Sequence, residues 1–250
     1  EKTQESQFDM LKNLELSFDD FRRLKEYCTT KNIDFISTPD GAESLRCLVE
    51  MNVSKIKIGS TEVTIYPFLE LIAKVGKPVI LSTGMSTLGE VERAVDILME
   101  NGTQNIELMH CTTDYPTALC DVNLRAMLTL KNAFYLPVGY SDHTSGFEVA
   151  VASVALGASV IEKHITLDRE MKGPDHKASM TPEEFAEYVR HIRNTEELLA
   201  DGRKRATGRE KIKMNQIRRS ILAARKLKAG TVLTEDKISL KRRGTGIDTE

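Results

Sequence analysis

Between residues 33 and 165, short apolar segments alternate with longer polar-and-apolar segments of helical periodicity. The short segments are rich in β-branched residues and end in polar side chains, which is typical of buried strands. Six of them predict strands: IDFIST (33–38), KIKIG (55–59), PVILST (78–83), IELMHC (106–111), LPVGYSD (136–142) and VIEKHI (160–165). Each is followed by a plausible helix, and this alternation indicates β/α units around a parallel sheet.

Helical spacing is clearest in two segments, FDDFRRLKEYC (18–28) and LGEVERAVDILMENG (88–102). Their apolar side chains recur on one stripe, as expected for a helix that packs on a core. A further helix start is predicted at Thr181, Pro182 and Glu184, which stand in the order of a capping box with proline at the first helical position.

The number of strands bears on the fold class. A closed barrel of β/α units needs eight strands, and only six are visible. The first residues, EKTQESQFDMLKNLEL, look like a loop and short helix that follow an earlier strand. We therefore predict an α/β fold, a TIM (β/α)8-type barrel over residues 1–200 that lacks about its first two β/α units. An open, six-stranded, doubly wound sheet is the alternative.

The composition changes after Ala200. The polar, glycine-containing segment ADGRKRATGREKIKMNQ predicts a linker over 201–216. The residues that follow contain a strand-like start, a glycine turn and a capped turn before another strand. They predict a small second domain over 217–250, which looks incomplete.

Charge and cysteine content narrow the class of protein. With 35 basic and 37 acidic residues, the net charge of −2 gives no overall field for nucleic acid or anionic lipid. The longest apolar stretch, VAVASVALGASVI, is too short and too interrupted by Gly and Ser to span a bilayer. Four cysteines without C-x-x-C spacing suggest free thiols in a reducing compartment. We therefore expect a cytoplasmic protein that binds neither nucleic acid nor membrane.

Two histidines stand at the carboxyl ends of consecutive predicted strands. His143 follows LPVGYSD, and His164 follows 21 residues later in VIEKHI. In a parallel barrel these strand ends lie side by side on the active face, so the two imidazoles can converge on one divalent metal.

A lysine inside a predicted strand is the second chemical signal. Lys57 is flanked by Ile56 and Ile58, and a buried ammonium is costly unless it finds an anion. Anion binding or catalysis is the functional interpretation, and a structural ion pair is the alternative.

Several ordered segments resemble the sialic acid synthase family, which comprises N-acetylneuraminate synthase and its legionaminate and pseudaminate relatives. They are KIKIGSTEVTIYPFLELIAKVGKPVILSTGM, LMHCTTDYP, LPVGYSDHTSG and VIEKHITLDREMKGPDHKAS. The tail resembles the antifreeze-like (SAF) domain of that family. The resemblance implies condensation of phosphoenolpyruvate with an N-acetylated mannosamine-type sugar, giving a nine-carbon 2-keto sugar acid and phosphate.

The resemblance also implies roles for the metal ligands and the phosphoenolpyruvate site. His143 and His164 would bind Mn²⁺, with Mg²⁺ or Co²⁺ as other options, and the ion would polarise the sugar aldehyde. The positions that match catalytic and phosphoenolpyruvate-binding residues are Lys57, Ser60, Ser82 and Ser141, with Thr38 in the substrate pocket and Glu62 as an acidic residue that pairs with Lys57 or shuttles a proton.

Sugar binding and assembly follow from the same likeness. Tyr115 and Asp175 match positions that hydrogen-bond the sugar. Arg242 matches an arginine that reaches into a partner's barrel, which implies a domain-swapped homodimer. The sequence departs from the family at Asp40 and Gly41, where an aromatic residue is usual. No part of it matches the catalytic glutamate and ligand contacts that the family carries on its first two strands.

Two other functions stay open. Lys57 could form a Schiff base in an aldolase, and the histidine pair would then have no purpose. A catalytically inactive, sugar-binding fragment is the third possibility.

Overall fold

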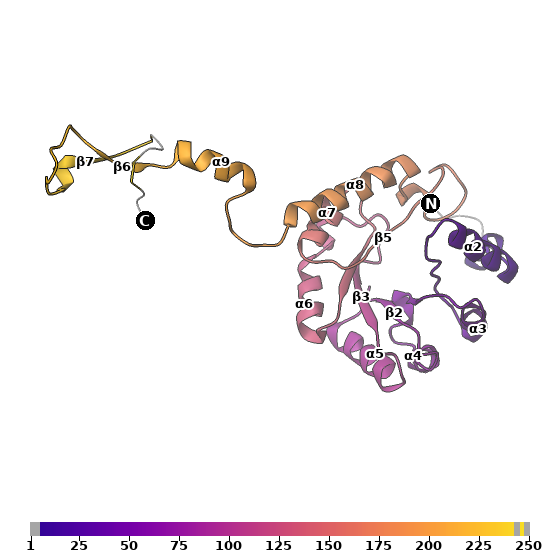
Figure 1. Cartoon of the computed structure of the whole chain (residues 1–250). Coiled ribbons are helices and arrows are strands. Elements are labelled where there is room, and N and C mark those ends of the chain that lie inside the picture. The colour runs from indigo at the N-terminus through magenta and orange to yellow at the C-terminus, as the bar shows by residue number, and fades with distance from the viewer. Residues whose placement is uncertain (1–5, 243–245, 248–250) are drawn as a thin grey trace. The chain divides into compact units, whose positions relative to one another are not determined.

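The computed structural model describes residues 6–242, 246 and 247, and it divides into two compact units, Glu1–Ala200 and Asp201–Glu250. The first unit holds a parallel sheet surrounded by helices, and the second holds a short antiparallel pair of strands (Figure 1). The division falls at the end of helix α8 (Pro182–Leu199).

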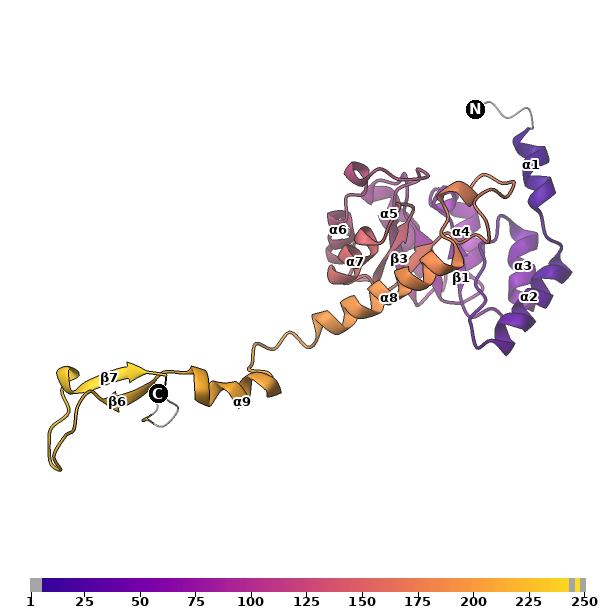
Figure 2. The ribbon, with the colours of Figure 1, turned by 90° about the horizontal axis from the view of Figure 1, so that it is seen from above.

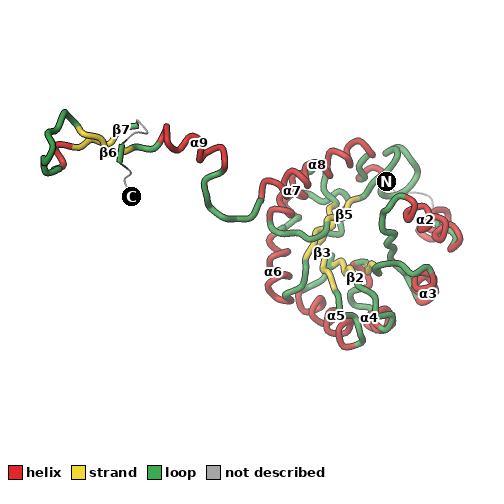
Figure 3. The backbone as a smooth tube through the Cα atoms, in the orientation of Figure 1, coloured by secondary structure: helices red, strands yellow, loops and turns green. Residues whose placement is uncertain are grey.

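The sheet of the first unit has five parallel strands in sequential order. They are β1 (Ile56–Ile58), β2 (Val79–Ser82), β3 (Ile106–Cys111), β4 (Val138–Asp142) and β5 (Ile161–Lys163). A doubly wound sheet reverses its strand order and carries helices on both faces. Here the strands curl and the helices lie outside the curl (Figures 1 and 3), so the partial barrel is confirmed and the doubly wound alternative is wrong.

The degree of curl is visible in a side-chain contact. Lys57 on β1 and Glu162 on β5 belong to the two outermost strands, yet their charged atoms are 3.4 Å apart. In a flat sheet three intervening strands would separate them by far more, since neighbouring strands lie about 4.8 Å apart. The concave face therefore encloses a narrow interior into which side chains from all five strands point.

The sixth predicted strand, at 33–38, does not form. Ser37 makes a single parallel bridge to Ile56, with the Lys57 N–H donating to the Ser37 carbonyl at 3.2 Å. A ladder needs repeated pairs, and this segment makes only this one bridge to β1. Among the described residues no strand lies on the other side of this segment, so it stays extended without becoming a strand.

The helices follow the strands as predicted and surround the convex face (Figures 1 and 2). The capping box predicted at the start of α8 is present. The Thr181 N–H donates to the Glu184 carboxylate at 2.9 Å, and the Glu184 N–H donates to the Thr181 hydroxyl oxygen at 3.4 Å. None of the described helices is both long and apolar enough to cross a membrane. The α-helices before α8 are α1 (Gln7–Leu14), α2 (Phe18–Thr30), α3 (Ala42–Glu50), α4 (Tyr66–Ala73), α5 (Leu88–Glu100), α6 (Arg125–Phe134) and α7 (Glu148–Ala155). The 3₁₀ turns are Ser60–Glu62, Leu119–Asp121, His176–Ala178 and Glu235–Lys237.

The core lies between the sheet and these helices. Every residue of β2 and β4 is buried, which is expected for parallel strands covered on both faces. The fully buried side chains include Ile56, Ile58, Leu81 and Leu108. This packing holds the carboxyl ends of the strands in fixed positions.

The second unit consists of α9 (Gly208–Ile217), β6 (Ser220–Ala223) and β7 (Ile238–Lys241). The two strands pair antiparallel, from Ser220 with Lys241 to Ala223 with Ile238. Most of α9 lies in the range 201–216, where a linker was expected, and Thr207 starts it with a capping box. The identity of this unit as an antifreeze-like domain stays a prediction.

Candidate functional site

The two histidines lie together at the ends of β4 and β5. Side chains alternate along a strand, so Ser141 and His143 share one face, as do Glu162 and His164. The imidazole centroids of His143 and His164 are 5.2 Å apart, with the rings nearly perpendicular at 89°. The structure thus brings the predicted pair together on the interior face of the curl.

The His143 ring is held in one tautomer. Its Nδ1–H donates to the Thr112 carbonyl at 2.7 Å, so the Nε2 atom carries the lone pair when the ring is neutral. Burial lowers the pKa of His143, and the nearby His164 contributes in the same direction. A neutral imidazole with a free Nε2 is the form that binds metals, and a carbonyl on the other nitrogen is a usual support for such a ligand.

The groups around the pair fit an open metal site. Among the described residues there is no cluster of three or more His, Cys, Asp or Glu side chains suited to a metal. Two imidazoles alone would hold an ion only together with oxygens of water or substrate. Nitrogen and oxygen donors of this kind suit Mn²⁺ or Co²⁺ better than Ca²⁺. The metal itself stays a prediction.

Lys57 lies on the same interior face. Its Nζ donates to Ser82 Oγ at 2.7 Å and is 3.4 Å from a Glu162 carboxylate oxygen. The other Glu162 oxygen accepts a hydrogen bond of 2.6 Å from Ser141, whose Oγ lies 3.3 Å from His143 Nε2. Because the Ser141 proton goes to Glu162, this polar network runs from the ammonium to Ser141 and leaves the Nε2 lone pair of His143 free.

Glu162 is a site residue that the sequence analysis missed. The available signal was its position in EKH, two residues before His164 and hence on the same face of the strand. Glu62, the predicted partner of Lys57, instead accepts a 2.7 Å hydrogen bond from Thr61. Within the described structure the carboxylate that pairs with Lys57 is Glu162, so the predicted pairing of Glu62 with Lys57 is wrong. A proton-shuttle role for Glu62 stays a prediction.

Ser60 connects three strand ends. Its Oγ accepts from the Gly84 N–H at 3.0 Å and lies 3.3 Å from the thiol of Cys111. The geometry places Ser60 after β1, against the residues that follow β2 and the last residue of β3. The hydroxyl is therefore positioned on the same active edge of the sheet as Ser82 and Ser141.

Tyr115 and Asp175 lie beside the histidines. The Tyr115 ring centroid is 4.2 Å from that of His143 and 5.5 Å from that of His164. Burial, followed by nearby negative charge, raises the pKa of Tyr115, so its hydroxyl stays protonated. An Asp175 oxygen is 3.8 Å from His164 Nδ1 and, with His164, lines a hollow of about 370 Å³. Both side chains are partly exposed, as groups that meet a soluble ligand must be.

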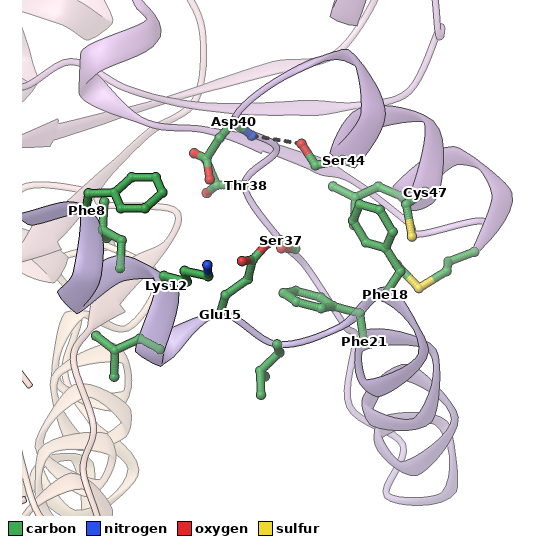
Figure 4. Close-up of a pocket in the computed structure, with 15 residues that line it drawn as sticks. Phe8, Lys12, Glu15, Phe18, Phe21, Ser37, Thr38, Asp40, Ser44 and Cys47 are labelled. Atoms are coloured by element: carbon green, nitrogen blue, oxygen red, sulfur yellow. Dashed lines mark hydrogen bonds between the residues drawn. The ribbon is translucent and has the colours of Figure 1, made fainter. Parts of the chain in front are cut away.

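Two predicted site residues lie elsewhere. Thr38 lines a larger hollow of about 660 Å³ between α1, α2 and α3, where Figure 4 shows it near Asp40 and Lys12. That hollow is lined mainly by apolar side chains and does not include the histidines or Lys57. Arg242 follows β7 in the second unit. Their predicted contacts with substrate therefore stay predictions.

Comparison with known proteins identifies relatives over nearly the whole chain. It is 46% identical to N,N'-diacetyllegionaminic acid synthase of Campylobacter jejuni, covering 97% of this chain and 73% of that protein. It is 36% identical to human N-acetylneuraminate-9-phosphate synthase, covering 92% of this chain and 64% of that protein. An uncharacterized protein of Methanocaldococcus jannaschii is 51% identical, over 97% of this chain and 72% of its own length.

Solved structures agree with this relationship. The sialic acid synthetase of Leptospira borgpetersenii superposes with a TM-score of 0.77 at 36% identity, covering 82% of this chain and 72% of that one. A DAHP synthase of Thermotoga maritima shares the fold, with a TM-score of 0.66 at 21% identity and coverage of 73% and 56%. The family model that matches residues 1–204 is that of the NeuB family. This match covers most of the chain and agrees with the relatives, and the chain therefore belongs to the NeuB family.

Proposed function

We propose that this protein is a nonulosonic acid synthase that condenses phosphoenolpyruvate with an N-acetylated mannosamine-type sugar. Relatives named as legionaminic, pseudaminic and N-acetylneuraminate-9-phosphate synthases support the class of product. One observation carries the proposal: the His143–His164 imidazole pair lies on the same interior face as Lys57, which is held by Ser82 and Glu162. The first group suits a metal and a sugar, and the second suits an anion.

Lys57, Ser82 and Ser141 would bind the phosphoenolpyruvate. An ammonium supplies a positive charge and hydroxyls supply short hydrogen bonds, which together suit phosphate and carboxylate groups. In the protein alone, Glu162 neutralises Lys57 at 3.4 Å. A bound phosphate carries more negative charge than one carboxylate, so it would compete with Glu162 for this ammonium.

His143 and His164 would hold the divalent ion. When bound, the ion supplies Lewis-acid polarisation of the sugar's aldehyde oxygen, which makes the aldehyde carbon a better electrophile. Tyr115 donates from a protonated hydroxyl, and Asp175 accepts from sugar hydroxyls. These two residues orient the sugar so that its aldehyde carbon faces the enol carbon of phosphoenolpyruvate.

The overall reaction forms one carbon–carbon bond, consumes one water molecule and releases inorganic phosphate. Phosphate release is therefore the direct test. We expect release when the full-length protein is mixed with phosphoenolpyruvate, Mn²⁺ and one of a panel of N-acetylated mannosamine-type sugars, and loss of release on adding a chelator. No release with any sugar, or release unaffected by the chelator, contradicts the proposal.

The two other functions give different results in parallel measurements. A Schiff-base aldolase would allow borohydride to trap pyruvate on Lys57. An inactive sugar-binding fragment would bind sugar in calorimetry without turnover.

A further inference from the structure

Behind the two imidazoles lies a buried ion pair for which the proposed reaction has no use. Asp142 and Lys163 are opposite each other in the β4–β5 ladder, each one residue before a histidine. Lys163 Nζ is 3.2 Å from Asp142 Oδ2, and the two side chains are 2% and 0% exposed. Because side chains alternate along strands, this pair points away from the interior face that carries His143 and His164.

The pair is tied to the residue that follows His143. Asp142 Oδ1 accepts from the Thr144 N–H at 2.9 Å and from the Thr144 hydroxyl at 2.6 Å. Lys163 donates to the Thr144 carbonyl. The N–H, hydroxyl and carbonyl of Thr144 are thus all engaged by the two charged side chains, so the backbone is fixed on both sides of His143.

Helix α8 completes the arrangement. Tyr188 donates its hydroxyl to Asp142 Oδ2 at 2.8 Å, and its ring lies 5.5 Å from Lys163 Nζ. We call Asp142, Thr144, Lys163 and Tyr188 the buried clamp. Nearly every polar atom that the clamp brings into the protein has a partner, which is what makes a buried charge tolerable.

Stability alone does not account for such a pair. Removing two charges from water costs several kcal/mol per ion, and apolar replacements of buried pairs are often neutral or stabilising. We propose that the Asp142–Lys163 pair is a positioning device, which sets the ends of β4 and β5 so that His143 and His164 present their ring nitrogens to one metal ion. This inference rests on the metal site of the proposed function.

The test is the double variant Asp142→Asn/Lys163→Met, which removes both charges and leaves neither one buried alone. We expect its unfolding midpoint to stay within about 4 °C of that of the unmodified protein. We expect its affinity for Mn²⁺ and Co²⁺, measured by calorimetry, to fall by about 10 to 100-fold, the usual effect of losing support behind a ligand.

A second readout does not need the metal. In the metal-free protein, the His143 ring N–H that donates to Thr112 should give a protected, downfield NMR proton signal. We expect the double variant to lose this signal or shift it strongly. Tyr188→Phe removes only the hydroxyl that donates to Asp142, and it should weaken metal binding by about 10-fold, the lower end of the same range. If the double variant does not fold, this single variant tests the positioning role.

The matched control is Lys55→Met/Glu107→Gln. This pair links the residue before β1 to β3, with Lys55 Nζ 3.8 Å from Glu107 Oε2, and it lies at the opposite end of the strands. It should leave metal affinity and the His143 signal unchanged.

The possible failures are distinguishable. If the unmodified protein binds no metal but its His143 signal disappears in the double variant, the proposed metal site is wrong, and the ion pair positions only the His143 ring. If a folded double variant keeps both the metal affinity and the ring signal, the clamp has no positioning role.

Discussion

His143 illustrates how neighbours prepare a single side chain. The Thr112 carbonyl fixes its tautomer, the buried surroundings lower its pKa, and the Tyr115 ring covers it. Lys57 is held in a nearly buried position by its ion pair with Glu162 and its hydrogen bond to Ser82. One interior face thus carries both an imidazole prepared for a metal and an ammonium prepared for an anion.

The lowered pKa of His143 predicts a pH dependence. A free histidine is protonated below about pH 6.5, and only the neutral ring binds metal. Because the folded pKa is depressed, the His143 ring should stay neutral as the pH falls to 6.5 and take up its proton only below it. The same protonation should destabilise the fold, since the unfolded state takes up the proton first. An NMR titration of the His143 ring in the metal-free protein from pH 5 to 8 measures this, and a ring already half protonated at pH 7 contradicts it.

Replacing Lys57 by methionine tests the anion site. The change removes a charge-assisted hydrogen bond, about 1.5 to 3 kcal/mol, which corresponds to roughly 10 to 150-fold weaker phosphoenolpyruvate binding. We expect a higher KM for phosphoenolpyruvate with the sugar KM little changed. Lys55→Met is the matched control, because that lysine lies just before the same strand and pairs with Glu107 at the other end of the sheet. An equal effect of both variants would show that Lys57 affects phosphoenolpyruvate binding only through the net charge of the protein and not through a direct contact.

At the scale of elements, the register of β4 against β5 determines the site. Ser141 is opposite Glu162, and Asp142 is opposite Lys163, so a shift by one residue would turn each of these side chains to the wrong face. The close approach of the two strands depends on Gly139. A Cβ built there would lie 2.5 Å from the Val160 carbonyl oxygen, which is backbone and has little freedom to move.

Gly139→Ala should therefore destabilise the protein by about 1 to 3 kcal/mol, the usual cost of overpacking. It should also weaken metal binding, because it pushes apart the strands that carry the histidines. Gly89→Ala in α5 is the control, since a Cβ there meets nothing within 4 Å and alanine favours helices by up to about 1 kcal/mol. Urea unfolding compares the two, and a neutral Gly139 variant would mean that the strands can adjust without loss.

At the scale of the whole molecule, the chain has two units, and the predicted role of Arg242 requires the second unit of one copy to serve the first unit of another. Such an arrangement makes a site from two chains. The described part of the first unit holds the histidines, Lys57 and Glu162 but not Arg242.

Mixing two variants tests this assembly. His143→Ala removes a metal ligand from the first unit, and Arg242→Ala removes the arginine from the second. If Arg242 acts across a dimer, hybrids of the two inactive variants contain one intact site in two, and random mixing restores about a quarter of the activity. Light scattering should show a dimer for both variants. Dimers that stay inactive after mixing would mean that Arg242 acts within its own chain, and an active Arg242→Ala variant would mean that Arg242 has no role.

The sequence by itself determined the features that depend on local spacing. Alternating apolar segments predicted β1 to β5, the order of Thr181, Pro182 and Glu184 predicted the start of α8, and two strand-end histidines predicted a convergent pair. These features are encoded within a few residues, and the rule that parallel strands share one active edge carries them into three dimensions.

The tertiary structure alone decided which distant groups meet. The curl of the sheet gives Lys57 on β1 its partner Glu162 on β5, where the sequence suggested the neighbouring Glu62. The tertiary structure also shows that the segment 33–38 makes a single bridge to β1. Asp142 and Lys163 form a buried ion pair behind the histidines. Contacts of this kind depend on the curvature of the whole sheet, which is the sum of packing over many residues and is not encoded in any one segment.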